Sequence, residues 1–85
     1  MNREEILKSG QAEFRIMRSG MFQRLMFKVK YEESQDGKIP YLFLEKYIDP
    51  PALMKIAQDS DLPVWTKNGK FFPPGKGSLD FLIKD

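Results

Sequence analysis

The sequence contains no cysteine and no histidine, and it has a single tryptophan, Trp65. Without cysteine the chain can form no disulfide, and it offers neither a thiol nucleophile nor a thiolate ligand for zinc. Without histidine it lacks the imidazole on which many acid–base mechanisms and metal sites depend. Most familiar catalytic arrangements are therefore excluded, and we expect neither a metal nor a cofactor.

The remaining reactive residue types do not form a catalytic pattern. The local sequence places no base beside a nucleophile. Residues 70–78 are rich in glycine and proline, but a phosphate-binding P-loop needs glycine where Lys70 stands and serine or threonine where Gly77 stands. Asp59 and Asp61 supply only two carboxylates, too few to fix a hard cation. We predict that the protein is not an enzyme.

Long apolar runs are also absent. The longest strongly apolar run covers residues 41–44, far short of the ~20 residues that cross a bilayer. Residues 2–5 are charged or polar and lead only to Ile6 and Leu7, which is not the hydrophobic region of a signal peptide. We expect a cytoplasmic protein with no membrane partner.

What the sequence does contain is the composition of a folded domain with an uneven charge. Of its 85 residues, 41% are hydrophobic, 31% charged and 13% aromatic, which predicts one small domain over residues 1–85. The net charge is only +2. However, residues 11–30 hold five cations against Glu13, and residues 67–77 hold three lysines and no carboxylate. If the fold brings these segments together, one surface becomes basic.

The first half of the chain predicts a short helix and three strands. Asn2 can cap a helical turn that Gly10 ends. Apolar and polar residues alternate over residues 12–17 and 24–31, which predicts two strands joined at Ser19-Gly20. Residues 39–48 are apolar on both faces around Phe43, which predicts a third, central strand.

The second half predicts the main helix followed by further strands. Asp49 precedes two prolines, and Leu53 and Ile56 have helical spacing, so we expect a helix over residues 50–59. Asn68-Gly69 predicts a hairpin, and alternation at residues 79–83 predicts a last strand.

The predicted fold is α+β: a small antiparallel sheet, or a partly closed five- to six-stranded barrel, with a short N-terminal helix and one main helix between strands 3 and 4. This element order fits a Greek-key barrel of the oligonucleotide-binding type. An SH3-like barrel or an open sheet packed on the main helix would give the same order.

The first hairpin can be predicted to the level of side chains. A two-residue loop at Ser19-Gly20 puts Arg15 directly across from Arg24. Like charges in a direct pair cost stability, which favours an anionic partner, and guanidinium groups suit phosphate. Alternatively, Glu13 relieves the repulsion and the face is merely solvated. The other expected pairs are Arg18 with Met21, Phe14 with Leu25, Ala12 with Phe27, Glu13 with Met26 and Gln11 with Lys28.

The same reasoning at Asn68-Gly69 pairs Lys67 with Lys70 and Trp65 with Phe72. Both rings and both lysines would then share one face. Single-stranded nucleic acid binds such faces, because bases stack on the rings while lysines contact phosphates. An aromatic pair in so small a domain is also typical of a core with lysines at its rim.

These features favour a non-enzymatic binding module for single-stranded or structured nucleic acid. The alternative is a protein-interaction or oligomerising subunit that uses the apolar third strand, residues 39–44, or exposed side chains of the first hairpin. The candidate side chains for that alternative are Met17, Met21, Phe22 and Met26. The candidate nucleic-acid-binding residues are Arg15, Arg24, Lys28, Lys30, Trp65, Lys67, Lys70, Phe72 and Lys76.

Overall fold

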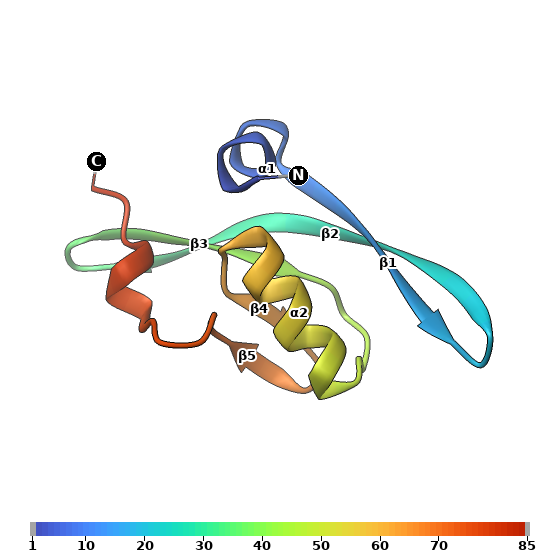
Figure 1. Ribbon diagram of the computed structural model, residues 1–85. Coiled ribbons are helices and arrows are strands. Elements are labelled where there is room, and N and C mark those ends of the chain that lie inside the picture. Colours follow the sequence, from blue (N-terminus) through green and yellow to red (C-terminus); the bar gives the residue numbers. More distant parts are fainter. Residues whose placement is uncertain (1, 85) are drawn as a thin grey trace.

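The computed structural model describes residues 2–84 and contains one five-stranded sheet and two α-helices (Figure 1). The strands lie in the order β1-β2-β3-β4-β5. β3 and β4 are parallel, and the other neighbours are antiparallel. The elements are α1 (Arg3–Ser9), β1 (Gln11–Arg18), β2 (Met21–Ser34), β3 (Gly37–Phe43), α2 (Pro50–Ser60), β4 (Val64–Thr66), β5 (Gly69–Phe71) and a 3₁₀ turn, η1 (Ser78–Phe81).

The α+β class, the short N-terminal helix and the main helix between strands 3 and 4 are confirmed. The purely antiparallel sheet is not. α2 carries the chain back along the sheet, so β4 runs in the same direction as β3. Within residues 2–84 the sheet is open, with β1 and β5 at its two edges, and no barrel is formed.

The helix α1 begins and ends where the sequence predicts. The side chain of Asn2 accepts a hydrogen bond of 2.9 Å from the backbone N–H of Glu5. Gly10 ends the helix with φ +79°, a left-handed conformation that glycine adopts without steric cost. Ile6 is fully buried and joins the core. Together with the partly buried Leu7, it packs α1 against the core.

The first hairpin has the predicted register. Ser19 and Gly20 both have positive φ, as a type I′ turn requires, and Arg18 pairs with Met21. Arg15 consequently lies opposite Arg24, and every other predicted pair is present. β2 continues for 14 residues and pairs with β3 beyond the end of β1. The tip of the hairpin therefore projects past the rest of the sheet (Figure 1).

The register predicted for the second hairpin is wrong by two residues, because the turn lies one residue earlier in the chain. Lys67 and Asn68 form the turn, and Trp65 pairs with Lys70 instead of Phe72. Only Gly69 has a positive φ, so the turn is not the type I′ turn that Asn68-Gly69 predicts. The Asn68 side chain is used elsewhere: its oxygen accepts hydrogen bonds from the backbone of Ile48 at 2.9 Å and from the hydroxyl of Thr66 at 3.1 Å.

Two further elements differ from the prediction. The third strand ends at Phe43, because the N–H of Lys46 bonds back to the carbonyl of Leu44 and turns the chain. The last strand is replaced by η1, in which the carboxylate of Asp80 accepts from the N–H of Gly77. Only Ile83 continues in the extended form, as an isolated bridge to Lys38.

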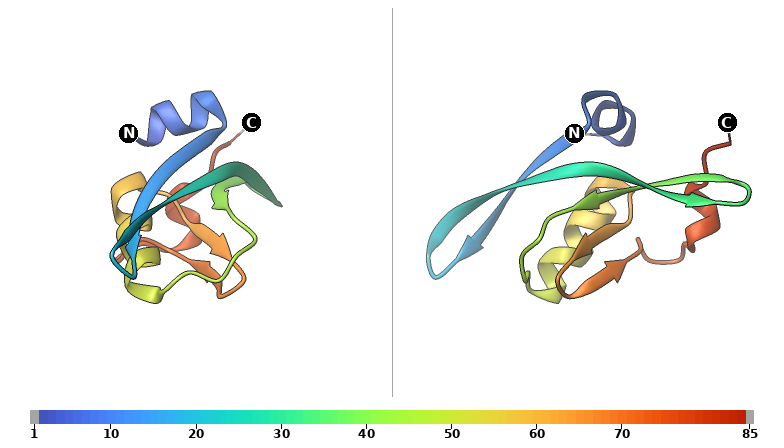
Figure 2. Two further views of the ribbon diagram at one scale, coloured as in Figure 1. Left: turned by 90° about the vertical axis from the view of Figure 1, so that its right-hand side faces the viewer. Right: turned by 180° about the vertical axis from the view of Figure 1, so that it is seen from behind.

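Both α-helices pack on the same face of the sheet, here called the inner face. Seen from behind, β4 and β5 lie in front of α2 (Figure 2). Apolar residues of the helices and of alternate strand positions form one cluster, which supplies most of the stability of so small a domain. Its members are Ile6, Ala12, Leu25, Phe27, Leu42, Ile48, Leu53, Ile56, Ala57, Leu62 and Val64. Within residues 2–84 neither helix has the length and apolarity that crossing a bilayer requires.

Candidate functional site

The face of the sheet opposite the two α-helices, here called the outer face, gathers basic and aromatic side chains. Residues directly opposite each other in neighbouring strands point to the same side. The pairing therefore connects one row across the sheet, from Lys28 through Phe43 and Trp65 to Lys70. A second pair, Lys30 with Tyr41, lies two residues further along the strands on the same side.

Six of the nine predicted binding residues belong to the outer face. Gln11 of β1 pairs with Lys28 and so belongs to the same row. Arg15 follows Gln11 by four residues and Arg24 precedes Lys28 by four, so both side chains point to the outer face. One lysine of the second basic segment, Lys70, thus shares a face with four cations of the first segment. The six residues are Arg15, Arg24, Lys28, Lys30, Trp65 and Lys70.

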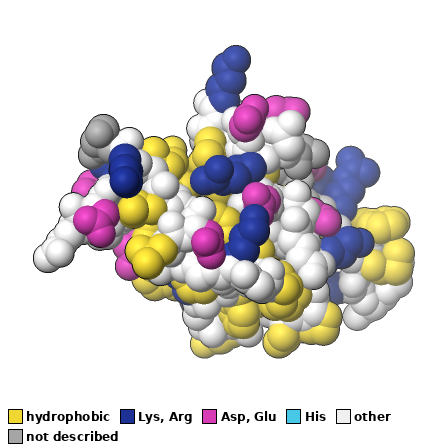
Figure 3. Space-filling view, turned by 60° about the vertical axis from the view of Figure 1, so that its left-hand side comes forward, with side chains coloured by type: hydrophobic (Ala, Val, Ile, Leu, Met, Phe, Trp, Pro, Cys, Tyr) yellow, Lys and Arg dark blue, Asp and Glu magenta, His cyan; other side chains and the backbone are white. Residues whose placement is uncertain are grey.

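Two carboxylates on the outer face reduce its charge. Glu13 forms an ion pair with Arg24, and Glu32 forms one with Lys70. Glu13 thereby relieves the repulsion between Arg15 and Arg24, as the alternative interpretation of the hairpin expects. Five cations face these two carboxylates, and Glu45 borders the hollow described below, so the face keeps a small positive charge. Acidic side chains also lie among the basic ones on the side of the molecule drawn in Figure 3.

Aromatic rings and ammonium groups are in direct contact on this face. Lys70 places its ammonium 4.7 Å from the ring centroid of Tyr41 and 4.8 Å from that of Trp65. The two rings are themselves 5.5 Å apart. Tyr41 is buried beneath them, whereas Trp65 keeps 39% of its surface exposed. The indole is held in place and still reaches solvent.

A shallow hollow of about 260 Å³ lies beside this cluster. Lys30 holds its ammonium 4.1 Å from the ring of Phe43, which is half-buried. The hollow is thus bordered by two lysines and includes an aromatic ring. The residues around it are Met26, Lys28, Lys30, Phe43, Leu44 and Glu45.

The other three predicted residues are not part of this arrangement. Lys67 lies in the β4–β5 turn, with its ammonium 5.9 Å from the ring of Tyr47. Phe72 lies beyond the end of β5 and stacks on Phe81, with 6.4 Å between centroids. Lys76 forms an ion pair with Asp61. The prediction that Phe72 and Lys67 share a face with Trp65 fails because β4 ends at Thr66 and β5 ends at Phe71, so Lys67 falls in the turn and Phe72 lies past the last strand.

The sequence reasoning missed Tyr41, Phe43 and Glu32 as parts of this face. The turn between β2 and β3 is the tight Gln35-Asp36, because Ser34 pairs with Gly37. The second and third strands were predicted to end at residue 31 and begin at residue 39, whereas β2 and β3 extend to this turn and place Phe43 across from Lys28. The Asp36-Gly37 dipeptide marks a hairpin here, but it places the turn one residue later than the observed Gln35-Asp36 and would not have given this pairing.

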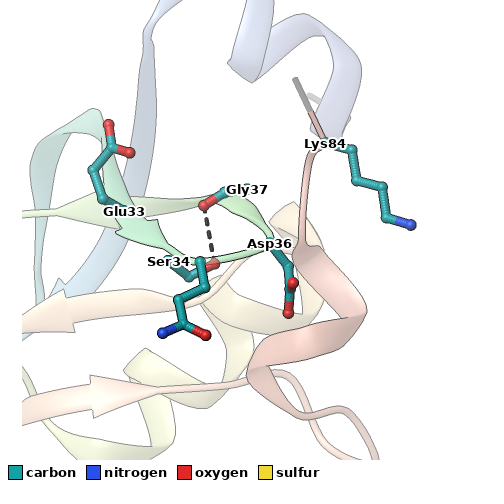
Figure 4. Close-up of a pocket in the computed structure, with 6 residues that line it drawn as sticks. Glu33, Ser34, Asp36, Gly37 and Lys84 are labelled. Carbon is teal, nitrogen blue, oxygen red and sulfur yellow. Dashed lines mark hydrogen bonds between the residues drawn. The ribbon is translucent and has the colours of Figure 1, made fainter.

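A second hollow, of about 310 Å³, lies at that β2–β3 turn (Figure 4). Its carboxylates, Glu33 and Asp36, point in different directions, and Lys84 extends away from both. The Ser34 hydroxyl donates to the carbonyl of Gly37 at 2.9 Å, which only closes the turn. Nowhere in residues 2–84 do three or more of the acidic, cysteine or histidine side chains that bind metals come together. The polar side chains around this hollow therefore do not point toward a common ligand position.

Comparisons of the chain with protein-family models, with curated proteins and with solved structures found no match. The function is therefore argued from the outer face alone.

Proposed function

We propose that the protein is a non-enzymatic binding module that holds single-stranded nucleic acid on the outer face of its sheet. The observation that carries the proposal is the common placement of Arg15, Arg24, Lys28, Lys30 and Lys70 on the same face of the sheet as the partly exposed indole of Trp65. Both basic segments of the sequence contribute to this surface.

The chemistry of the face suits an unpaired strand better than a duplex. Unpaired bases expose their ring faces and stack on aromatic side chains whatever their identity, while cations contact the backbone phosphates. Trp65 offers such a ring, and the hollow beside Phe43 offers a second place for a base between Lys28 and Lys30. In a duplex the bases are already stacked on one another and cannot use these rings.

The charge of the face sets the expected strength of binding. Arg15, Lys28 and Lys30 have no ion-pair partner within residues 2–84, whereas Arg24 and Lys70 do. With three to five phosphates contacted, the logarithm of the association constant should fall against the logarithm of salt concentration with a slope of about −2 to −3.5. Moderate affinity without base preference is the expected result.

Trp65 provides the test, because it is the only tryptophan. A base stacked on the indole should quench its fluorescence during titration with a short oligothymidylate, and added salt should reverse the quenching. The variant Lys28→Glu/Lys30→Glu should bind at least ~10-fold more weakly, because two phosphate contacts become repulsive. Lys84→Glu, which changes charge at the β2–β3 turn, is the control. Salt-independent binding, or none at high protein concentration, would contradict the proposal.

A second candidate function, the binding of a protein, is favoured by exposed apolar side chains near the hairpin tip. Met17 is 62% exposed, Met21 74% and Phe22 71%. Flexible Met side chains of this kind adapt to protein partners. The third strand, by contrast, offers little surface, because β3 is paired on both sides and residues 39–42 are buried. If a partner protein docks on the tip, Phe22→Ser should abolish its binding and leave oligonucleotide binding intact.

A further inference from the structure

The two edges of the sheet differ in whether another strand can join them. β5 has only three residues and is followed two and three residues later by Pro73 and Pro74, which cannot donate backbone hydrogen bonds. β1 has eight residues, Gln11–Arg18, and contains no proline or glycine. β1 is therefore the edge that can accept an additional strand.

The hairpin geometry shows which backbone groups of β1 point outward. In an antiparallel pair of strands, the backbone N–H and C=O groups of every second residue point to the same neighbouring strand. The carbonyl of Gly10 accepts from the N–H of Val29, on the β2 side, at 3.0 Å. The carbonyl of Gln11 accepts from the Ser9 hydroxyl at 2.9 Å. Gln11 and the residues at even spacing from it therefore direct their N–H and C=O groups to the open edge.

Three of these outward residues, Glu13, Arg15 and Met17, have no backbone partner on that edge within residues 2–84. Their side chains lie on the outer face, where Glu13 and Arg15 carry opposite charges two residues apart. A strand that pairs antiparallel with β1 must also direct the N–H and C=O groups of every second residue toward the shared edge. Its side chains must complement the charges of Glu13 and Arg15.

We propose that this edge binds β1 of a second copy of the chain, so that two sheets join across a twofold axis at Phe14. In this register Glu13 lies opposite Arg15 of the second copy, and the reverse contact is equivalent. Both are outward residues, so each such pair can exchange two backbone hydrogen bonds. Shifting the register by two residues in either direction places Glu13 against Glu13, or Arg15 against Arg15. The charges therefore select one register.

The inner face is also self-complementary in that register. Phe14 would contact Phe14 of the second copy, and Ala12 would contact Ile16. Phe14 and Ile16 are only half-buried in the monomer and border an apolar cleft of about 290 Å³ between β1 and α2. A second copy would cover this apolar edge as well as the backbone groups. At the end of the pairing Arg18 would face Gly10, which has no side chain to obstruct it.

Joining the edges would also affect the outer face. A twofold axis perpendicular to the sheet leaves both outer faces on the same side, so the basic surfaces of the two copies become continuous. Each Glu13, already paired with Arg24 of its own chain, would gain Arg15 of the second copy as another partner. The dimer does not depend on the nucleic-acid proposal, and it can be tested without any ligand.

Charge exchange at two positions tests the register. Sedimentation equilibrium without nucleic acid should show the wild-type 9.9-kDa chain doubling in mass as its concentration rises through ~0.1 to 1 mM. Glu13→Arg alone and Arg15→Glu alone should each be monomeric, because every cross-edge pair becomes repulsive. The double variant Glu13→Arg/Arg15→Glu should dimerise again, and an equimolar mixture of the two single variants should form a heterodimer.

Lys84→Glu, remote from β1, should dimerise like the wild type, and circular dichroism should show that every variant is folded. A wild-type chain that stays monomeric throughout overturns the proposal. It is equally overturned if either single variant dimerises alone, or if the mixture and the double variant stay monomeric. A monomer that still binds oligonucleotide would reject the dimer and leave the proposed function standing.

Discussion

Trp65 and Lys70 are direct cross-strand partners, and the ammonium of Lys70 lies 4.8 Å from the indole centroid. Beneath them Tyr41 supplies a second ring at 4.7 Å from the same ammonium. This contact fixes the indole on the outer face while 39% of its surface remains in solvent. A cation held against a ring can meet a phosphate at the same time as the ring meets a base.

Trp65→Ala should weaken oligonucleotide binding ~5- to 100-fold, because stacking on an aromatic side chain contributes about 1–3 kcal/mol per base. The free energy of unfolding should fall by only about 1–2 kcal/mol, since the ring is partly exposed. Fluorescence anisotropy of a labelled oligonucleotide and urea unfolding measure the two effects. Tyr47→Ala removes an exposed ring outside the sheet and should not change binding. Equal loss in both variants would argue against stacking on Trp65.

Glu32→Gln should strengthen oligonucleotide binding by about 2- to 5-fold, because it removes a negative charge from the outer face and frees Lys70 from its ion pair. The neighbouring Glu33→Gln provides a matched control. Glu33 follows Glu32 in β2, so its side chain points to the opposite side of the sheet. Anisotropy titrations at one low salt concentration compare the two variants. If Glu33→Gln strengthens binding as much as Glu32→Gln, the effect is one of net charge and not of this face.

Gly37→Ala should lower the free energy of unfolding by about 2–4 kcal/mol. Gly37 has φ +150°, and an added Cβ would collide with the carbonyl oxygen of Ile83. That oxygen accepts from the N–H of Lys38 at 2.9 Å, so the collision would detach the C-terminal segment from β3. Gly75→Ala is the control: φ is +78° but no atom lies within 4 Å, and we expect a cost of about 1 kcal/mol. Urea unfolding with equal losses in both variants would contradict this explanation.

The parts of the fold that were predictable are those set by local chemistry. Ser19-Gly20 fixes the first hairpin because its φ values and the alternation on both sides agree. At Asn68-Gly69 the same local signal failed, because the Asn68 side chain bonds to Ile48, 20 residues away in sequence. The parallel pairing of β3 with β4 also depends on long-range packing, through α2. Neither interaction is visible in a short stretch of sequence.

The same distinction applies to the candidate site. Arg15 and Arg24 could be placed together from one turn, and the structure confirms that they face each other. Phe72 was expected to pair with Trp65, but β5 ends at Phe71, and Phe72 stacks on Phe81 instead. The contribution of Tyr41 required knowledge of how β2 pairs with β3. Sequence alone thus identified all five cations of the outer face but, of its aromatic cluster, only Trp65.

Backbone amide shifts, followed by NMR during titration with a short oligothymidylate, would show where the ligand lies. Binding to the outer face predicts the largest shifts at Arg24, Lys28, Lys30, Trp65 and Lys70, with little change at Lys76, and reversal of these shifts when salt is added. Shifts centred on α1, α2 or the β2–β3 turn, or no shifts at millimolar oligonucleotide, would show that the outer face does not bind nucleic acid.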